Sequence, residues 1–187
     1  MEPTIPWQPV PEQGAPRSRD DAGLSDVLAA VVGGARRRAV RDGDRQIDTA
    51  HLLRSLLEYD FDVRAVFGEG PRTARLLGYL VQRSIGYGLR WQSGVEDSGA
   101  VPGAPDTEGF SPVAAGAMAY ARQRAAQRGA PRARGLDLLA AIVMDPQARA
   151  VEVLARAGID TVEVLARIDK YGEETAGDAS GVGECAR

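Results

Sequence analysis

Apolar residues recur at helical spacing in two long stretches of the chain. The first apolar series of each stretch follows the i, i+3/i+4 spacing of an amphipathic helix. The members of these series are Leu28, Val31, Val32 and Ala35 in the first stretch and Val113, Ala117, Tyr120 and Ala121 in the second. A shorter run with a broad apolar face follows in each stretch, at 52–57 and 138–143. The pattern therefore predicts helices throughout both stretches.

Capping residues predict where these helices begin and end. Ser111-Pro112 combines an N-cap hydroxyl with a proline at the first helical position, so we expect a helix over Val113–Arg128 that ends at Gly129. Ser25 and Gly43 bracket the equivalent helix of the first stretch. The other expected helices are Ala50–Glu58, Val63–Phe67, Arg72–Ile85, Leu136–Met144, Gln147–Ala157 and Thr161–Tyr171. Thr49 is the expected N-cap of the first of these, and Asp145-Pro146 and Gly158 bracket the fifth. Asp160 and Glu163 are expected to form a capping box at the start of the last.

The two stretches are related by an internal duplication. When Leu24–Leu57 is aligned with Phe110–Val143, an offset of 86 residues, 10 of 34 positions are identical. A repeat of this kind predicts two similar supersecondary units. Each unit holds about four short helices and cannot bury its apolar face well alone. We therefore expect an all-α fold of about eight helices, in two pseudo-twofold repeats that pack as one domain.

The remaining segments flank or join the repeats. Five prolines within residues 1–21 exclude a helix there, and we interpret this segment as a disordered arm or as a docking peptide anchored by Trp7. Glycine, proline and polar residues at 93–109 indicate a flexible linker, and 172–187 is expected to be a disordered acidic tail. Repeat 1 then spans 22–92 and repeat 2 spans 110–171.

Composition excludes several function classes. Aromatic residues are only 5% of the chain, which favours a core of close-packed Ala, Leu and Val side chains. The net charge of −3 offers no overall reason to expect nucleic acid as a partner. One histidine, His51, and one cysteine, Cys185, cannot supply the ligands of a Cys/His zinc site or an internal disulfide. We therefore predict no metal, no cofactor and no catalytic residues, and we do not expect an enzyme.

No segment reaches the roughly 18 apolar residues that a membrane span needs. The first 21 residues also lack the basic and then apolar pattern of a signal peptide. We therefore expect a cytoplasmic monomer that does not bind membranes.

The order of the motifs resembles the Clp N-terminal repeat domain, which stands at the front of Clp-type AAA+ unfoldases. The resemblance covers about residues 22–92 and 108–171. The residues that carry it in the first repeat are Leu24-Ser25-Asp26, 35–39 and Ile47-Asp48-Thr49-Ala50-His51-Leu52-Leu53. Those in the second are Phe110-Ser111-Pro112, 121–125, Gly135-Leu136-Asp137-Leu138-Leu139 and 153–160. The resemblance implies a domain that receives substrates and adaptors for an unfoldase.

No G-x-x-x-x-G-K-[ST] loop that could cradle ATP phosphates occurs in the sequence. We therefore expect a stand-alone Clp-type N-domain without a motor. Such a protein would act as an adaptor or regulator that binds the Clp unfoldase, the peptidase core, or their substrates and adaptors. Alternatively, it would act as a decoy that sequesters cyclic peptides aimed at the unfoldase.

Two family ligands bear on this expectation. In related unfoldases a glutamate beside the helix-two threonine of each repeat binds the guanidinium of phosphorylated arginine; Ala50 and Leu136 stand at these positions here, so that site is expected to be lost. In actinobacterial relatives a phenylalanine that opens the second repeat helps to bind cyclic peptides, and Phe110 matches it. The partner aromatic of the first repeat falls at Asp21.

These comparisons give the candidate site residues. Phe110, Ser111 and Val113 are the candidate peptide-binding residues, and Phe110 is either a core plug at the start of its helix or part of an exposed binding patch. The candidate docking surface consists of arginines on the first helix of each repeat, where Arg36-Arg37-Arg38 is expected to be exposed: Arg36, Arg37, Arg41, Arg122 and Arg124. A solvated helix face is the alternative for these arginines, and a nucleic-acid-binding regulator is the alternative function.

Three further positions receive structural interpretations. His51 follows the second-helix cap beside Leu52 and Leu53 and is expected to be a hydrogen-bonded structural histidine. Tyr87 and Trp91 are expected to cover the joint between the repeats, with exposed contact residues as the alternative. Cys185 is expected to be an exposed tail thiol without a role.

Overall fold

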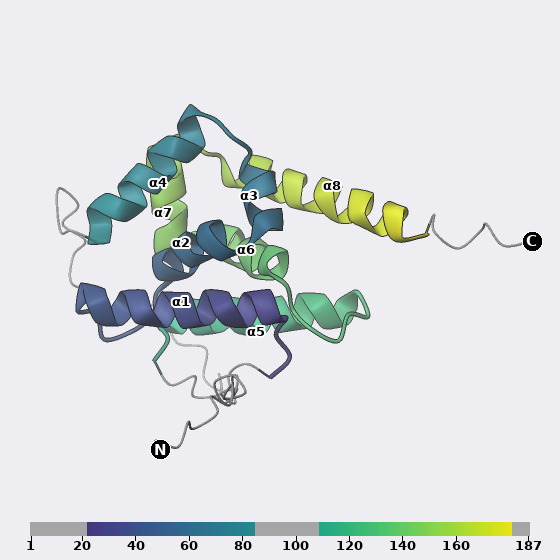
Figure 1. The fold of residues 1–187 in the computed structure, drawn as a ribbon, viewed down its shortest axis with the longest axis horizontal. Helices are drawn as coiled ribbons and strands as arrows, with labels where there is room; N and C mark the ends of the chain where they lie inside the picture. The colour runs from purple at the N-terminus through teal and green to yellow at the C-terminus, as the bar shows by residue number, and fades with distance from the viewer. Residues whose placement is uncertain (1–21, 85–108, 181–187) are drawn as a thin grey trace, which may run out of the picture.

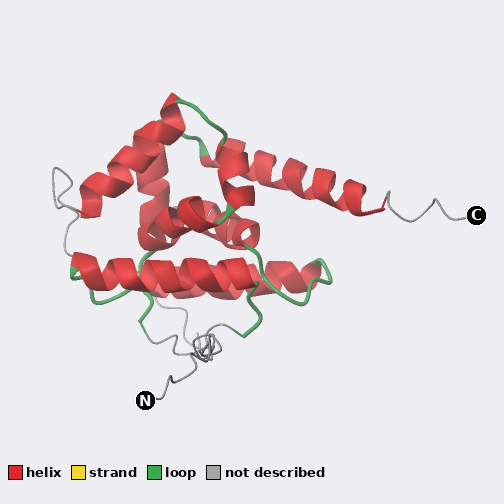
Figure 2. Ribbon diagram, in the orientation of Figure 1, coloured by secondary structure: helices red, strands yellow, loops and turns green. Residues whose placement is uncertain are grey.

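The computed structural model describes residues 22–84 and 109–180, and the regular structure within these ranges is entirely helical (Figure 2). The expected all-α fold of about eight helices is confirmed. The helices of repeat 1 are α1 (Asp26–Asp42), α2 (Thr49–Tyr59), α3 (Phe61–Phe67) and α4 (Pro71–Ser84). Those of repeat 2 are α5 (Pro112–Gln127), α6 (Gly135–Met144), α7 (Arg149–Ala157) and α8 (Thr161–Ser180).

The first helix of each repeat begins at the predicted hydroxyl cap. Ser25 Oγ accepts a hydrogen bond from the Leu28 N–H at 3.2 Å, and Ser111 Oγ accepts one from the Ala114 N–H at 3.1 Å. Gly43 ends α1 with φ 76°, a left-handed conformation that glycine adopts without strain. These local signals are sufficient to set the limits of α1 and the start of α5.

Two short backbone pairings connect the repeats reciprocally. Leu24 forms an isolated parallel bridge with Ala133, and Phe110 forms one with Ile47. The two bridges are equivalent under the 86-residue offset, because each opening segment pairs with the segment before the second helix of the other repeat. Their hydrogen bonds correspond one to one: the Ser25 N–H donates to Ala133 O at 2.9 Å, and the Ser111 N–H donates to Ile47 O at 2.9 Å. The pseudo-twofold relation therefore extends to the backbone.

The helices pack with the same reciprocity. In each repeat the first helix lies against the second, so α1 contacts α2 and α5 contacts α6. The last two helices of each repeat cross to the other repeat, where α4 packs against α7 and α3 packs against α6 and α8. Helices α1 and α5 run along the lower edge of the view in Figure 1, with α2 and α6 above them and α4, α7, α3 and α8 beyond. The repeats thus share one core.

That core consists mainly of aliphatic and small side chains, as the composition predicts. Its largest fully buried members are Leu28, Leu52, Leu53, Leu56, Leu76, Met118, Leu138, Leu139, Ile142 and Leu154. Alanine lines the close approaches between helices, as in α5, where Ala114, Ala117, Ala121 and Ala125 are buried. Small residues at these positions let short helices pack closely.

Several predicted boundaries are wrong. The N-cap of α2 is Asp48, and Thr49 is its first helical residue. Helix α7 starts at Arg149 instead of Gln147, because the Ala148 N–H first closes a turn onto Asp145 O at 3.0 Å. Helix α8 continues to Ser180, nine residues beyond the predicted end at Tyr171 and into the segment expected to be a disordered tail. Residues 172–180 contain two glycines, Gly172 and Gly177, but no proline, and the helix continues through them.

The capping box expected at the start of α8 forms only in part. Asp160 Oδ1 accepts from the Val162 N–H at 2.9 Å, while the Glu163 carboxylate pairs with Arg167 one turn later. No helix in the described part of the chain is long and apolar enough to cross a membrane. The predicted arm at 1–21, the predicted linker apart from Gly109, and Trp7, Tyr87, Trp91 and Cys185 lie outside the described residues.

Candidate functional site

The three candidate peptide-binding residues are brought together, but they lie in the interior. Phe110 is 5% exposed, and Ser111 and Val113 are buried as well. Phe110 is the counterpart of Leu24, and both side chains fill the core beside the backbone bridges that join the repeats. The exposed-patch interpretation of Phe110 is therefore wrong, and its alternative, a core plug at the helix start, is confirmed.

The arginines of α1 separate into exposed and buried positions. Arg36, Arg37 and Arg41 are exposed, as expected for a docking surface. Arg38 is buried and ion-paired with Glu58 of α2, so its predicted place on the exposed face is wrong. The reason is helical periodicity, since Arg38 continues the stripe of Val31 and Ala35 that faces α2.

The arginines of α5 bind carboxylates of neighbouring helices. Arg124 pairs with Asp169 of α8 at 2.8 Å and lies 3.7 Å from Asp137 of α6, and Arg128 pairs with Asp137 at 2.6 Å. Arg122 donates to the Ala22 carbonyl at 3.4 Å. The α5 cluster is therefore used within the fold, and so is Arg37 of α1, which donates to the Tyr59 hydroxyl at 3.4 Å.

The two family positions for phosphoarginine are both buried. Ala50 lies in the first turn of α2, and Leu136 lies in the first turn of α6. Leu136 forms part of a hollow of about 590 Å³ between α5, α6 and α8, whose polar lining includes Arg128 and Asp137. Neither position offers a carboxylate to a guanidinium group.

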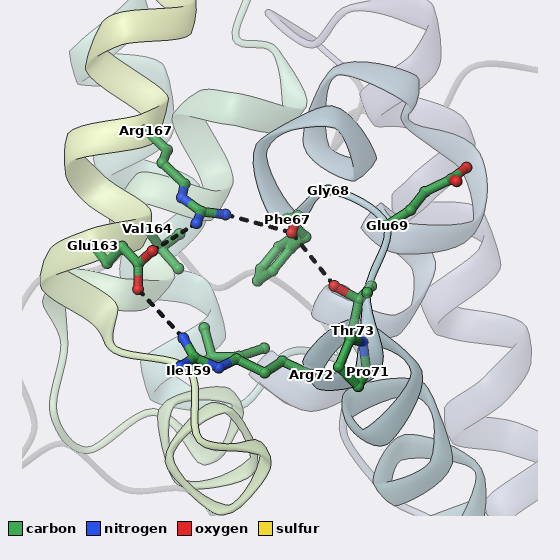
Figure 3. Close-up of a pocket in the computed structure, with 11 residues that line it drawn as sticks. Phe67, Gly68, Glu69, Pro71, Arg72, Thr73, Ile159, Glu163, Val164 and Arg167 are labelled. Carbon is green, nitrogen blue, oxygen red and sulfur yellow. Dashed lines mark hydrogen bonds and ion pairs between the residues drawn. The ribbon is translucent and has the colours of Figure 1, made fainter.

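A second hollow, of about 300 Å³, lies where the α3–α4 connection meets the start of α8 (Figure 3). We call it the inter-repeat pocket, because its walls come from both repeats. Its lining residues are Phe67, Gly68, Glu69, Gly70, Pro71, Arg72, Thr73, Ile159, Glu163, Val164 and Arg167. Phe67, Ile159 and Val164 are among the apolar side chains of its walls. Charged side chains of both signs, including Arg72 and Glu163, lie beside them.

Arg167 fixes the geometry of this pocket. Its guanidinium donates to the carbonyls of Val66 and Phe67, at 3.2 and 3.5 Å, and pairs with Glu163 at 2.6 Å. The two carbonyls end α3, where a cation interacts favourably with the helix dipole. Glu163 also lies 3.8 Å from Arg72 of α4, so one carboxylate connects both arginines, as Figure 3 shows.

Reasoning from the sequence missed this pocket. Residues Gly68-Glu69-Gly70-Pro71 form a break between two helices, and that signal was available. The opposite wall, however, comes from residues about 100 positions further along the chain. Nothing local connects Arg167 to the end of α3, so only the packing of the repeats reveals the site.

His51 is buried and forms the capping box with Asp48, as expected for a structural histidine. The Asp48 N–H donates to His51 Nδ1 at 3.2 Å, and the His51 N–H donates to Asp48 Oδ1 at 2.9 Å. Asp48 in turn pairs with Arg149 of α7 at 3.0 Å. Among the described residues, Asp44, Asp48 and His51 place their ligand atoms within 4.8 Å of one another.

Comparison with known proteins gives the fold alone. No family model matches the chain. No curated protein matches it either. Solved structures do match, among them a chain from preliminary structural investigations of a malarial protein secretion system. That chain is 14% identical with a TM-score of 0.60, and the match covers 82% of this chain and 97% of the other.

Proposed function

We propose that this chain is a non-enzymatic protein-binding module of a Clp protease system, acting as an adaptor, regulator or decoy of a ClpC-type unfoldase. The observation that carries the proposal is the reciprocal pairing of two four-helix repeats around one core. This architecture agrees with the resemblance to the Clp N-terminal repeat domain. Because one fold can serve many functions, the proposal also needs a specific binding site on the surface of this fold.

The inter-repeat pocket is the proposed place of contact with a peptide segment. Phe67, Ile159 and Val164 supply an apolar wall for one side chain. Arg72 is 65% exposed at the mouth and can pair with an acidic group of the partner, while Arg167 is held by the end of α3. An apolar pocket with a few oriented polar groups is the usual form of a small recognition site.

The alternative function, a nucleic-acid-binding regulator, has less support. Binding to phosphates requires cations that are free to replace counterions. Arg38, Arg124 and Arg128 are instead paired with carboxylates of the same chain. The decoy mechanism also has less support than the adaptor mechanism, because Phe110 lies in the core.

The test is affinity capture from lysate of the native host, with the full chain as bait and quantitative mass spectrometry as readout. Enrichment of Clp unfoldase or peptidase subunits is the expected result. Arg72→Glu should reduce this enrichment at least fivefold, since it reverses the charge at the pocket mouth. Arg75→Glu, an exposed position one turn further along α4 that does not line the pocket, is the matched control.

Two outcomes would contradict the proposal at different levels. If no Clp component is enriched above a bait-free control, the assignment to the Clp system fails. If Clp subunits are enriched equally by both variants, the assignment stands but the pocket is not the contact site. Steep loss of binding to a DNA or RNA probe with increasing salt would instead favour the alternative function.

A further inference from the structure

The solvent-facing side of α1 carries an apolar residue among arginines. Arg36, Arg37 and Arg41 are exposed, and Val40 between them is 76% exposed. Positions 33, 37, 40 and 41 follow the i, i+4, i+7, i+8 spacing that places residues on one side of a helix. We call Gly33, Arg37, Val40 and Arg41 the outer face of α1, and Arg36 borders this face.

The positive charge of the outer face is not cancelled by its neighbours. Arg37 donates to the Tyr59 hydroxyl at 3.4 Å, and this neutral group positions the guanidinium without removing its charge. Burial lowers the pKa of Arg38 and of Arg54, and the nearby charge of Arg41 lowers both pKa values further. Positive charge therefore accumulates at this end of α1. A carboxylate from outside the chain would be stabilised there.

Two residues of the outer face are unfavourable choices for an exposed helix. Glycine and β-branched valine both have lower helix propensity than alanine. The neighbouring Gly34 has a packing reason, because a Cβ there would overlap the Tyr59 ring. A Cβ at Gly33 would meet only the far end of the Arg37 side chain, at 3.4 Å, and Val40 is largely exposed. Packing within the described part of the chain therefore explains neither Gly33 nor Val40.

The same residues suit contact with a second helix. A glycine lets a partner helix approach the backbone of α1 closely, and Val40 offers an apolar contact about 10.5 Å further along the helix axis. Arg37 and Arg41 lie beside this line of contact and can pair with carboxylates at its edge. Charged residues beside an apolar seam set the choice of partner between packed helices in the same way.

The second repeat lacks this combination of residues. The positions of α5 that lie 86 residues after those of the outer face carry Ala119, Gln123, Ala126 and Gln127. Alanine and glutamine are good helix formers without charge, as an exposed helix surface with no partner permits. Since α5 occupies the equivalent place in the fold, the glycine, the valine and the two arginines of α1 are not requirements of the fold.

We propose that the outer face of α1 binds an acidic amphipathic helix of a partner protein. Interaction with the dipole of α1 would account for Arg41, which lies in its last turn, but not for Arg37 or Val40. Val40 favours a protein over a nucleic acid, because a phosphate backbone offers no apolar group to contact it. The outer face is separate from the inter-repeat pocket, since α1 and the α3–α4 connection lie at opposite edges of the view in Figure 1. The proposal therefore does not depend on the assignment to a Clp system.

The test is fluorescence anisotropy of the full chain with a labelled helical peptide of about 20 residues, made of alanine and glutamate with one stripe of leucine. We expect saturable binding that weakens with increasing salt, and the same peptide with serine in place of leucine should bind at least fivefold more weakly. Arg37→Gln combined with Arg41→Gln introduces the residues of the second repeat and should weaken binding at least tenfold. Arg64→Gln combined with Arg75→Gln removes the same charge from exposed positions of α3 and α4 and should bind as the parent does.

Gly33→Leu separates close approach from charge. The variant keeps every charge and favours the helix, so it should weaken peptide binding at least fivefold without lowering the melting temperature. Gly116→Leu on α5, where a Cβ meets nothing within 4 Å, is the matched control and should not change binding.

Four outcomes would overturn the proposal. The first two are the absence of saturable peptide binding by the parent and equal affinities of the parent and the Arg37→Gln, Arg41→Gln variant. The third is tighter binding of a DNA duplex than of the peptide, which would assign the face to nucleic acid. The fourth is self-association in sedimentation that the same arginine variant abolishes, which would make a second copy of this chain the occupant.

Discussion

At the scale of single residues, the equivalent helices α3 and α7 have their first backbone N–H groups capped in different ways. Helix α7 has Ala148 at its N-cap, and the Ala150 N–H is satisfied by Thr49 Oγ1 from the other repeat at 3.1 Å. Helix α3 instead caps itself with Asp60, and the position equivalent to Thr49 is Gly135, which leaves room for the Asp60 carboxylate. The hydroxyl of Thr49 thus caps α7, whereas the carboxylate of Asp60 caps α3 and lies against Gly135.

Gly135→Ala should destabilise the protein by about 1–3 kcal/mol, as overpacking of a filled site does. A Cβ at Gly135 would overlap Asp60 Oδ2 and crowd Leu56, so the cap of α3 would have to move. Urea unfolding monitored by circular dichroism measures the change. Gly116→Ala in α5, where a Cβ meets nothing within 4 Å, should instead gain up to about 1 kcal/mol. Equal effects of the two substitutions would contradict this account.

Asp60 should make stability depend on pH. Burial raises the pKa of its carboxyl, and the hydrogen bond from the Val63 N–H only partly opposes this. Because the native pKa exceeds the unfolded value of about 3.9, the favourable contribution of the protonated group is complete below that value and is lost as the pH rises through the native pKa. Asp60→Asn removes this titration and keeps an oxygen for the Val63 N–H.

The stability of the parent relative to Asp60→Asn should therefore fall as the pH rises from about 4 to 8. Urea midpoints of both proteins, measured across this range, give the difference directly. A difference that stays constant, or that grows with pH, would show that Asp60 is not the buried titrating group.

Phosphoarginine should bind with a dissociation constant no tighter than about 1 mM. Ala50 and Leu136 offer no carboxylate to the guanidinium, and both are buried. Calorimetric titration with a phosphoarginine peptide, and with its unphosphorylated form as control, measures this. Saturable binding at micromolar concentration would show that residues other than Ala50 and Leu136 control phosphoarginine binding.

At the scale of secondary structure, α3 and α8 are connected by side chains from opposite repeats. Tyr171 of α8 donates its hydroxyl to Asp62 of α3 at 3.0 Å, and this hydrogen bond raises the pKa of the tyrosine. Arg167, one turn earlier, holds the carbonyls that end α3. These contacts fix the first three turns of α8, and beyond them the helix projects away from the other helices (Figure 1).

Arg167→Ala should cost about 1–2 kcal/mol of stability, because it removes charge-assisted hydrogen bonds to two carbonyls at the C-terminus of α3. Urea denaturation measures the loss. Lys170→Ala on the same helix, whose exposed ion pair with Glu174 spans 3.7 Å, should change stability by less than about 0.5 kcal/mol. If the lysine variant loses as much as the arginine variant, the tether between α3 and α8 is not the cause.

At the scale of the whole molecule, the two repeats are connected by backbone bridges and by helices of one repeat that pack on helices of the other. The segment before α1 pairs with Ala133 of repeat 2, and the segment before α5 pairs with Ile47 of repeat 1. Helix α4 packs on α7, and α3 packs on α6 and α8. Each repeat therefore supplies a large part of the other's core.

Residues 1–92 and 93–187 expressed separately should each show reduced helicity and no cooperative thermal transition. Each half leaves the apolar faces that it normally buries in the other exposed to water. Mixing the halves in equal amounts should restore helical circular dichroism and a single melting transition. A cooperative transition from either half alone would show that one repeat folds independently.

Much of the fold follows from short-range signals in the sequence. Ser25, Gly43 and Ser111 act within one turn of their own helices, and the 86-residue offset relates two similar patterns. Helix ends that depend on residues of other helices do not follow from such local signals. Thr49 serves α7 rather than its own helix, a use that capping rules cannot anticipate, because the Ala150 N–H is 101 residues away.

The helices, the duplication and the aliphatic character of the core follow from the sequence, because caps and apolar periodicity act over a few residues. The buried positions of Phe110 and Arg38 and the contact of Arg167 with the end of α3 arise from the packing of the helices against one another. The same packing sets which carboxylates surround His51. These outcomes depend on pairs of elements brought together by packing, where burial and charge are set by distant neighbours rather than by adjacent residues.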